Sequence, residues 1–141
     1  MDQQFLLLAA APKKARKLFF ADPFIHHSVR QFLDLPVPSR IEDLEKDEIP
    51  GLVESCFVSH FKRGGPTFYI KARGEVDLAY VREGRFWPVE VKWTRDLRPE
   101  ELQQVAKYPN GLIAARTRRA ASILSVPVLP APVVLLRAAA D

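Results

Sequence analysis

The chain has 141 residues, 48% of them hydrophobic, which is enough for one domain with a buried core and too little for two ordinary ones. Its single cysteine, Cys56, excludes a disulfide within the chain and a zinc site made of several cysteines, and it fits a reducing compartment. The net charge is +4, and the basic residues concentrate in His60–Arg119, which favours either a polyanion such as nucleic acid or an ordinary solvated surface.

The first part of the chain contains an apolar start and one amphipathic helix. The start, MDQQFLLLAAAP, lacks the basic segment of a signal peptide and is too short to span a bilayer, so we expect a cytoplasmic protein without a membrane partner. A helix is predicted over Ala21–Leu35, because Asp22 is a good N-cap, Pro23 suits the first helical position and the apolar residues recur at helical spacing. The acidic stretch Ile41–Glu48 is expected to form a loop or a solvated helical turn.

The middle of the chain changes from helical to strand periodicity at the pair Gly64–Gly65. Before this pair, a second helix is predicted from Pro50, and it carries Glu54. After the pair, alternation with period two predicts an antiparallel meander of three strands: Thr67–Ala72, Glu75–Arg82 and Arg85–Trp93.

The last part of the chain is predicted to contain a helix, a strand and a proline-rich tail. The helix covers Arg98–Tyr108, since Glu100 and Glu101 suit its first turn. A fourth strand is predicted over Leu112–Thr117. The tail, Val126–Leu136, is either an edge strand or a strand that leads into a short helix.

The second and third predicted strands form a hairpin whose register gathers charged residues. With Glu83–Gly84 as the central turn residues, Asp77 lies opposite Glu90. Side chains alternate along a strand, so one face of the hairpin is apolar, with Val76 and Leu78 among its residues. A three-residue turn would instead move Asp77 to the opposite face from Glu90. In the predicted register, the other face carries four charges: Glu75, Asp77, Glu90 and Lys92.

Two carboxylates that face each other across a hairpin repel, so the predicted pair of Asp77 and Glu90 needs a compensating charge. A divalent cation would supply it, because Mg²⁺ and Ca²⁺ prefer hard oxygen ligands that can reach one ion from both positions. The alternative is a charge ladder on an exposed sheet face, in which Lys92 balances its acidic neighbours. The hairpin by itself leaves both interpretations open.

Four residues in chain order carry a resemblance to a known superfamily: Glu54 on a helix, Asp77 in GEVD, and Glu90 and Lys92 in EVK. The pattern resembles the PD-(D/E)XK phosphodiesterases, whose core is a helix, three strands, a helix and a strand, the order predicted above. Val76 stands where the name of the motif has proline, a variable position. The resemblance implies an α/β, restriction-endonuclease-like core over about residues 50–136 with a helical extension over about 16–48, in a single domain spanning 1–141.

Two further patterns are similar to those of RecB-type nucleases. Gly74 and Asp77 fit G-x-x-D. Gln104 and Tyr108 fit Q-x-x-x-Y on the next predicted helix, although Tyr108 also suits a core aromatic residue at a helix end. A second resemblance, over about Arg16–Leu136, is to the domain found C-terminal to many prokaryotic AAA-type ATPases. None of the six glycines builds a G-x-x-x-x-G-K-[ST] loop, so this chain has no nucleotide-hydrolysing motor of its own.

The resemblance implies a role for each of these residues around Mg²⁺ or Mn²⁺. Asp77, Glu90 and the backbone carbonyl of Val91 would hold the ion. Glu54 would bind a second ion or a metal-bound water, unless it is only a surface residue. Lys92 would activate or position the attacking water. The candidates for nucleic-acid contacts are Arg95, Arg98, Gln104, Tyr108, Arg116 and Arg118.

The sequence therefore leads to two functional hypotheses. The first is a metal-dependent phosphodiesterase that acts on DNA, as an endonuclease or an exonuclease. The alternative is a catalytically silent nuclease-like module that binds nucleic acid or a protein partner such as a separate AAA-type ATPase, since a fold does not fix a function. An unpaired edge strand in the tail would also allow a homodimer.

Overall fold

The computed structural model describes residues 17–40, 43–44, 48–71 and 74–139. Its elements are α2 (Phe24–Phe32), α3 (Glu48–Lys62), β1 (Thr67–Lys71), β2 (Glu75–Arg82), β3 (Arg85–Lys92), the 3₁₀ helices η2 (Pro99–Leu102) and η3 (Val105–Lys107), β4 (Leu112–Ala115), β5 (Ala121–Ile123), β6 (Val126–Pro130) and α4 (Ala131–Ala139). The six strands form one mixed sheet in the order β1-β2-β3-β4-β6-β5. The predicted mixed α/β class is confirmed, with a larger sheet than expected. No helix within the described ranges is long and apolar enough to cross a membrane.

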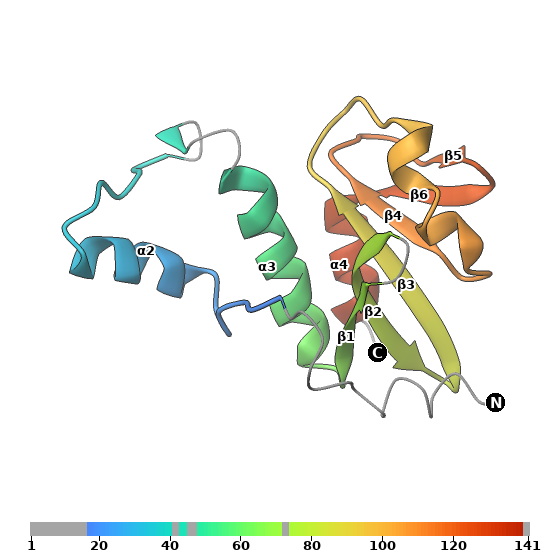
Figure 1. Ribbon diagram of the computed structural model, residues 1–141, viewed down its shortest axis with the longest axis horizontal. Helices are drawn as coiled ribbons and strands as arrows, with labels where there is room; N and C mark the ends of the chain where they lie inside the picture. Colours follow the sequence, from blue (N-terminus) through green and yellow to red (C-terminus); the bar gives the residue numbers. More distant parts are fainter. Residues whose placement is uncertain (1–16, 41–42, 45–47, 72–73, 140–141) are drawn as a thin grey trace.

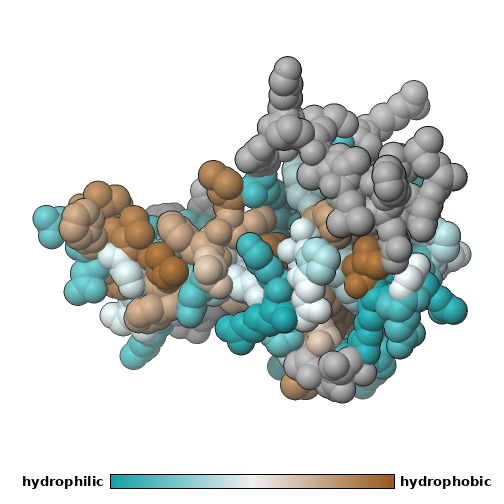
Figure 2. Space-filling model, turned by 90° about the horizontal axis from the view of Figure 1, so that it is seen from below, coloured by the Kyte–Doolittle hydropathy of each residue, from teal (hydrophilic) through white to brown (hydrophobic). Residues whose placement is uncertain are grey.

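Helix α2 confirms the first predicted helix, with tighter bounds than Ala21–Leu35. The Asp22 carboxylate accepts a hydrogen bond from the Phe24 backbone N–H at 2.8 Å, as expected for a residue that caps a helix start. No side chain of α2 is buried, and Phe24 and Phe32 are 70% and 86% exposed. The helix stands apart from the sheet in Figure 1, and apolar side chains gather over it at the left of Figure 2. The acidic stretch Ile41–Glu48 lies largely outside the described residues.

Helix α3 confirms the second predicted helix and begins at Glu48, slightly before the predicted start at Pro50. Proline is tolerated in a first turn because the N–H groups there have no partner within the helix. The helix ends shortly before Gly65, whose φ of 151° suits glycine. Phe57 and Phe61, one turn apart on α3, are buried against the sheet.

The hairpin of β2 and β3 has the predicted two-residue turn. Glu83 and Gly84 both have positive φ, 50° and 68°, as a turn of type I′ requires. The two strands keep the predicted register as far as the pair of Leu78 and Val89. Because β1 also pairs antiparallel with β2, the predicted three-stranded meander is confirmed.

A β-bulge interrupts β2 near its start. Asp77 and Leu78 together lie opposite a single residue of β1. The register of the pairing between β1 and β2 therefore shifts by one residue at this point. The extra residue reverses the alternation of side chains, so Val76 packs on the sheet face opposite to that of Leu78. The prediction that Val76 and Leu78 share one apolar face is therefore wrong.

The segment between β3 and β4 also differs from the prediction. The predicted helix Arg98–Tyr108 is wrong, because the chain forms the two short 3₁₀ helices η2 and η3 there. The apolar residues Leu102, Val105 and Tyr108 follow one another every three residues, which is the period of a 3₁₀ helix. Gly111 lets the segment pack closely, since a Cβ at this position would lie 2.4 Å from the Val105 carbonyl oxygen.

The C-terminal part of the sheet contains one strand that was not predicted. Strand β4 confirms the fourth predicted strand, with an earlier end, and β6 leads directly into α4 as in the second alternative for Val126–Leu136. Strand β6 is not an edge strand, because β5 pairs with its outer side. The turn between them has positive φ at Leu124 and Ser125, without the glycine or asparagine that usually marks such a turn. The sequence therefore carries no turn signal from which β5 could be predicted.

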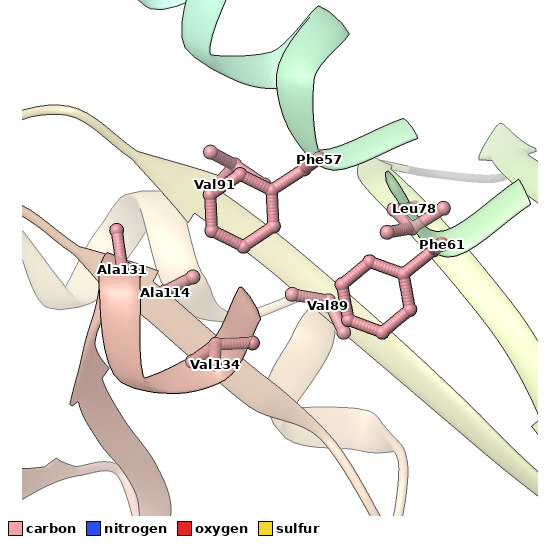
Figure 3. Close-up of a cluster of buried hydrophobic side chains, with 8 residues drawn as sticks. All are labelled: Phe57, Phe61, Leu78, Val89, Val91, Ala114, Ala131 and Val134. Atoms are coloured by element: carbon pink, nitrogen blue, oxygen red, sulfur yellow. The ribbon is translucent and has the colours of Figure 1, made fainter. Parts of the chain in front are cut away.

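Hydrophobic side chains cover both faces of the sheet. Helices α3 and α4 lie over one face, where a cluster of eight buried residues packs (Figure 3): Phe57, Phe61, Leu78, Val89, Val91, Ala114, Ala131 and Val134. The 3₁₀ segment lies over the second cluster: Val76, Leu102, Val105, Ile113, Ala115, Val126 and Val128. Close packing on both sides holds the backbones of β2 and β3 in place near the candidate site.

Candidate functional site

Asp77 lies in the bulge, where the pairing of β2 with β3 stops. The ladder ends at the pair of Leu78 and Val89, and beyond it the carboxylate of Asp77 takes the place of a backbone partner. Its Oδ2 accepts a hydrogen bond from the Val91 backbone N–H at 3.0 Å. The predicted pairing of Asp77 directly opposite Glu90 is therefore not formed. The bulge turns the carboxylate toward the other elements instead.

Glu54 approaches Asp77 from α3, and Lys17 lies between the two carboxylates. The Lys17 ammonium donates hydrogen bonds to Glu54 Oε1 and, at 3.1 Å, to Asp77 Oδ1. The side chains of Glu54 and Asp77 are each 14% exposed, so the alternative that Glu54 is a surface residue is wrong. Lys17 Nζ also lies 5.3 Å from the centroid of the Tyr69 ring.

The charges of Lys17, Glu54 and Asp77 shift the pKa values of Lys17 and Glu54. Burial raises the pKa of Glu54 to about 7, a rise that the hydrogen bond from Lys17 opposes and the charge of Asp77 reinforces. Burial lowers the pKa of Lys17, but its hydrogen bond to Glu54 and the charges of both carboxylates outweigh burial and raise it to about 12. Lys17 is therefore fully charged at neutral pH, whereas Glu54 is harder to ionise than an exposed glutamate.

Glu90 and Lys92 form a second charged pair, on β3. Lys92 Nζ lies 2.9 Å from Glu90 Oε1. Glu90 is only 5% exposed, and its Oε2 is buried without a hydrogen-bond partner in the described part of the chain. Burial raises the pKa of Glu90 to about 7, and the charge of Asp77 adds to this rise while Lys92 opposes it. An exposed ladder of charges, the alternative to a metal site, does not describe so buried a carboxylate.

Glu90 projects from the sheet face opposite to α3. It alternates with Val89 and Val91, whose side chains pack beneath α3 and α4, and its neighbour on β4 is Ile113 of the second cluster. The predicted common face for all the charged residues is thus wrong, because the bulge turns Asp77 toward α3 while Glu90 keeps the regular alternation of β3.

Asp77 joins the two charged groups, since its charge raises the pKa of both other carboxylates. Glu75 stays outside, because it is exposed and pairs with Lys71 at 3.1 Å instead of facing Lys92. The candidate site therefore consists of three carboxylates and two ammonium groups: Glu54, Asp77, Glu90, Lys17 and Lys92.

The capacity of these residues to hold a metal ion has one feature in its favour and one against it. Glu90 Oε2, buried and unpartnered among the described residues, is an oxygen that a cation would satisfy, and Asp77 is the carboxylate whose charge acts on Glu90. Lys17, however, already lies between Asp77 and Glu54, and no group of three or more His, Cys, Asp or Glu side chains within the described ranges is arranged to hold a metal. Among the described residues, Glu90 thus offers an oxygen to an ion as it stands, whereas Asp77 and Glu54 become available to one when Lys17 moves away.

Three of the predicted nucleic-acid residues line one cleft of about 550 Å³, just beyond the carboxyl ends of β3 and β4: Arg95, Arg116 and Arg118. The Arg116 guanidinium carbon lies 5.7 Å from the centroid of the Trp93 ring, and its backbone N–H donates to the Lys92 carbonyl at 3.1 Å. None of the three guanidinium groups forms an ion pair with a described residue. The cleft therefore offers unneutralised positive charge next to the strand that carries Lys92.

The other three predicted nucleic-acid residues do not line this cleft. Arg98 is exposed before η2. Gln104 packs against Gly74, where a Cβ would lie 3.1 Å from the Gln104 Cβ, and its Oε1 accepts a hydrogen bond from Lys107 at 2.7 Å. Tyr108 packs against Phe86, with ring centroids 5.7 Å apart, and against the second cluster. Its contacts favour the interpretation as a core aromatic residue.

Lys17 is the site residue that the sequence analysis missed. It lies 37 residues before Glu54 and 60 before Asp77, so only the folded chain brings it to these carboxylates and no local pattern marks it. Comparison of the chain with protein-family models, with curated proteins and with solved structures gives no match. The geometry of the site and the resemblance in the sequence are therefore the basis for a function.

Proposed function

We propose that the protein is a phosphodiesterase that uses Mg²⁺ or Mn²⁺ to cleave DNA, as an endonuclease or an exonuclease. The observation that carries this proposal is Glu90 Oε2, which is buried without a partner in the described chain and feels the charge of Asp77. A buried polar atom left unsatisfied costs about 1–3 kcal/mol, and two close carboxylates add repulsion. A divalent cation held by Asp77 and Glu90 would reduce both penalties.

The order of the elements supports the proposal. Helix α3, the meander β1–β3 and the parallel strand β4 follow one another as in the restriction-endonuclease-like core that the sequence resemblance implies. The 3₁₀ helices η2 and η3 stand where that core has a helix. We therefore propose this core for the chain, with α2 as an N-terminal extension.

Each residue of the site has a task in such a reaction. Asp77 and Glu90 would hold the ion, which when bound lowers the pKa of water and stabilises charge on the phosphate. Burial lowers the pKa of Lys92, but the hydrogen bond to Glu90 and the nearby carboxylate charges together outweigh it, so the net pKa is raised and the ammonium stays charged. Lys92 can therefore orient the attacking water or stabilise the phosphate as a point charge. Glu54 would bind a second ion or a metal-bound water.

The arginine cleft supports a polyanionic substrate. Arg95, Arg116 and Arg118 offer guanidinium groups to phosphate oxygens directly beside the end of β3. Because Lys92 ends β3 and its carbonyl is hydrogen-bonded to Arg116, a nucleic-acid backbone bound in the cleft lies close to the charged site. These contacts would position the strand without reading its sequence.

The test is cleavage of labelled single-stranded, duplex and branched DNA in the presence of Mn²⁺. We expect the wild type to cleave at least one substrate and to stop when the metal is chelated. Lys92→Ala should lose about 100-fold or more of the rate, as is usual for a group that acts on the attacking water. Arg85→Ala is the matched control, because Arg85 is exposed at the turn end of the hairpin. Cleavage that Lys92→Ala leaves unchanged, or no cleavage of any substrate, would contradict the proposal.

A second candidate function is binding of nucleic acid without cleavage. Lys17 favours it, because its ammonium balances Glu54 and Asp77 within the chain and so lowers their need for a metal ion. Calorimetry separates the candidates. Binding of Mn²⁺ that Asp77→Ala abolishes supports the phosphodiesterase, whereas salt-sensitive DNA binding that needs no metal supports the silent module.

Two protein partners stay predictions: a separate AAA-type ATPase and a second copy of the chain. A pull-down with the purified ATPase tests the first of them.

A further inference from the structure

Lys17 occupies the position between Glu54 and Asp77 that a bridging cation would need. Its ammonium contacts one carboxylate oxygen of each residue, Glu54 Oε1 and Asp77 Oδ1. Asp77 Oδ2 already accepts a hydrogen bond from the Val91 backbone N–H, so a divalent ion held by these carboxylates would compete with the Lys17 ammonium for the remaining oxygens. We propose that Lys17 competes with the divalent cation, and that full metal occupancy of the site requires Lys17 to leave it.

The surroundings of Lys17 allow such a departure. The Lys17 side chain is 32% exposed, whereas those of its two carboxylate partners are 14% exposed. Lys17 lines an open cleft of about 670 Å³ together with Ser59 and Lys62 of α3. The ammonium therefore has room to swing into solvent while both carboxylates stay where they are.

Among the described residues, few polar contacts attach the segment that carries Lys17 to the core. Apart from the two ion pairs of Lys17, the Ser59 hydroxyl donates a hydrogen bond to the Phe20 carbonyl at 3.2 Å. Leu18 is 90% exposed. The two carboxylates that Lys17 contacts, Glu54 and Asp77, are far from it in sequence. Glu90 and Lys92, in contrast, are held together by the backbone of β3. Lys17 can thus be released without disturbing the sheet.

The competition is tested by Mn²⁺ binding to the full chain at neutral pH, measured by calorimetry. The inference rests on the proposed metal-dependent function. If Lys17 competes, Lys17→Met should bind Mn²⁺ about 10-fold tighter or more, because the competing state is removed. Lys62→Met is the matched control, since it removes an exposed lysine of the same cleft and should change the affinity by less than about twofold. Equal or weaker binding by Lys17→Met would overturn the inference.

A second measurement uses the wild type alone and so does not depend on how well the variant folds. Amine labelling followed by mass spectrometry should modify Lys17 slowly without metal and several-fold faster when Mg²⁺ is present, while the rate for Lys62 stays constant. A Lys17 rate that Mg²⁺ does not change would overturn the inference.

The proposed function and the inference fail in different ways. Mn²⁺ binding that Asp77→Asn abolishes, with equal affinity in the wild type and Lys17→Met, would overturn the competition and leave the metal site intact. No Mn²⁺ binding by the wild type, Lys17→Met or Lys17→Gln would overturn both.

Discussion

The two charged groups of the site each pair a buried carboxylate with a lysine, but they are built differently. Glu90 and Lys92 are two residues apart on one strand, so the backbone of β3 sets their geometry. Lys17 reaches Glu54 and Asp77 from a segment before α2, across 37 and 60 residues. The comparison indicates that Lys92 is a fixed part of the site and that Lys17 is an exchangeable one.

The largest effect is expected where the two groups meet, at Asp77. Asp77→Asn removes the charge that both groups share but keeps an oxygen that can accept the hydrogen bond from Val91 N–H. We expect DNA cleavage with Mn²⁺ to fall about 100-fold or more, with little change in the unfolding midpoint. Cleavage assays and urea unfolding on the same preparations check this. A variant that loses stability but keeps its activity would give Asp77 a purely structural role.

The next effect distinguishes the two lysines by stability. Lys92→Met leaves the buried Glu90 without its counter-charge, and we expect the free energy of unfolding to fall by about 2 kcal/mol. Lys17→Met should cost about 1 kcal/mol or less, because Lys17 is about one-third exposed and water can replace it. Urea unfolding measures both values. Equal losses would remove the distinction between a fixed and an exchangeable lysine.

A smaller effect is expected in the arginine cleft beside the fixed group. Arg116→Ala should weaken DNA binding equally for all sequences and reduce the slope of log affinity against log salt by about one. Arg85→Ala, at the other end of the hairpin, is the control and should leave the slope unchanged. Fluorescence anisotropy at several salt concentrations measures the DNA affinity, and thus the slope, for the wild type and both variants. An unchanged slope in Arg116→Ala would exclude this cleft from the DNA interface.

The smallest effect concerns pH. Burial raises the pKa of Glu90 from 4.5 to about 7, so the folded chain binds more protons than the unfolded chain between these values. The free energy of unfolding should therefore fall as the pH rises through this window. Glu90→Gln removes this contribution, and the pH dependence should become weaker, although Glu54 keeps a contribution of the same sign. Urea unfolding at several pH values measures the slope, and an identical slope in the variant would contradict the burial of a titrating Glu90.

The hairpin could be predicted from sequence because its signals are local. A turn with Gly84 and the alternation along β2 and β3 determine the register, and the spacing of Glu90 and Lys92 puts them on one side of β3. The bulge at Asp77 and Leu78 has no such signal, since neither residue is a glycine or proline. The bulge turns Asp77 toward α3. As a result, Asp77 and Glu90 lie on opposite faces of the sheet and not on one face, as the sequence predicts.

The remaining differences arise from tertiary packing. The 3₁₀ segment has acidic residues in its first turn that also suit an α-helix, and its three-residue apolar spacing distinguishes the two only weakly. Lys17 reaches the site through contacts far apart in sequence, which no pattern of neighbouring residues predicts. The carboxylates of the site could thus be named from the sequence, but their mutual arrangement and the ammonium between them could not.

The most direct test of the account is a crystal soaked with Mn²⁺ and examined by anomalous scattering. The account predicts a peak about 2.0–2.5 Å from the carboxylate oxygens of Asp77 and Glu90, with the Lys17 ammonium displaced wherever an ion contacts Glu54. A crystal without such a peak, in which Lys17 still joins Glu54 and Asp77, would contradict the metal-dependent site.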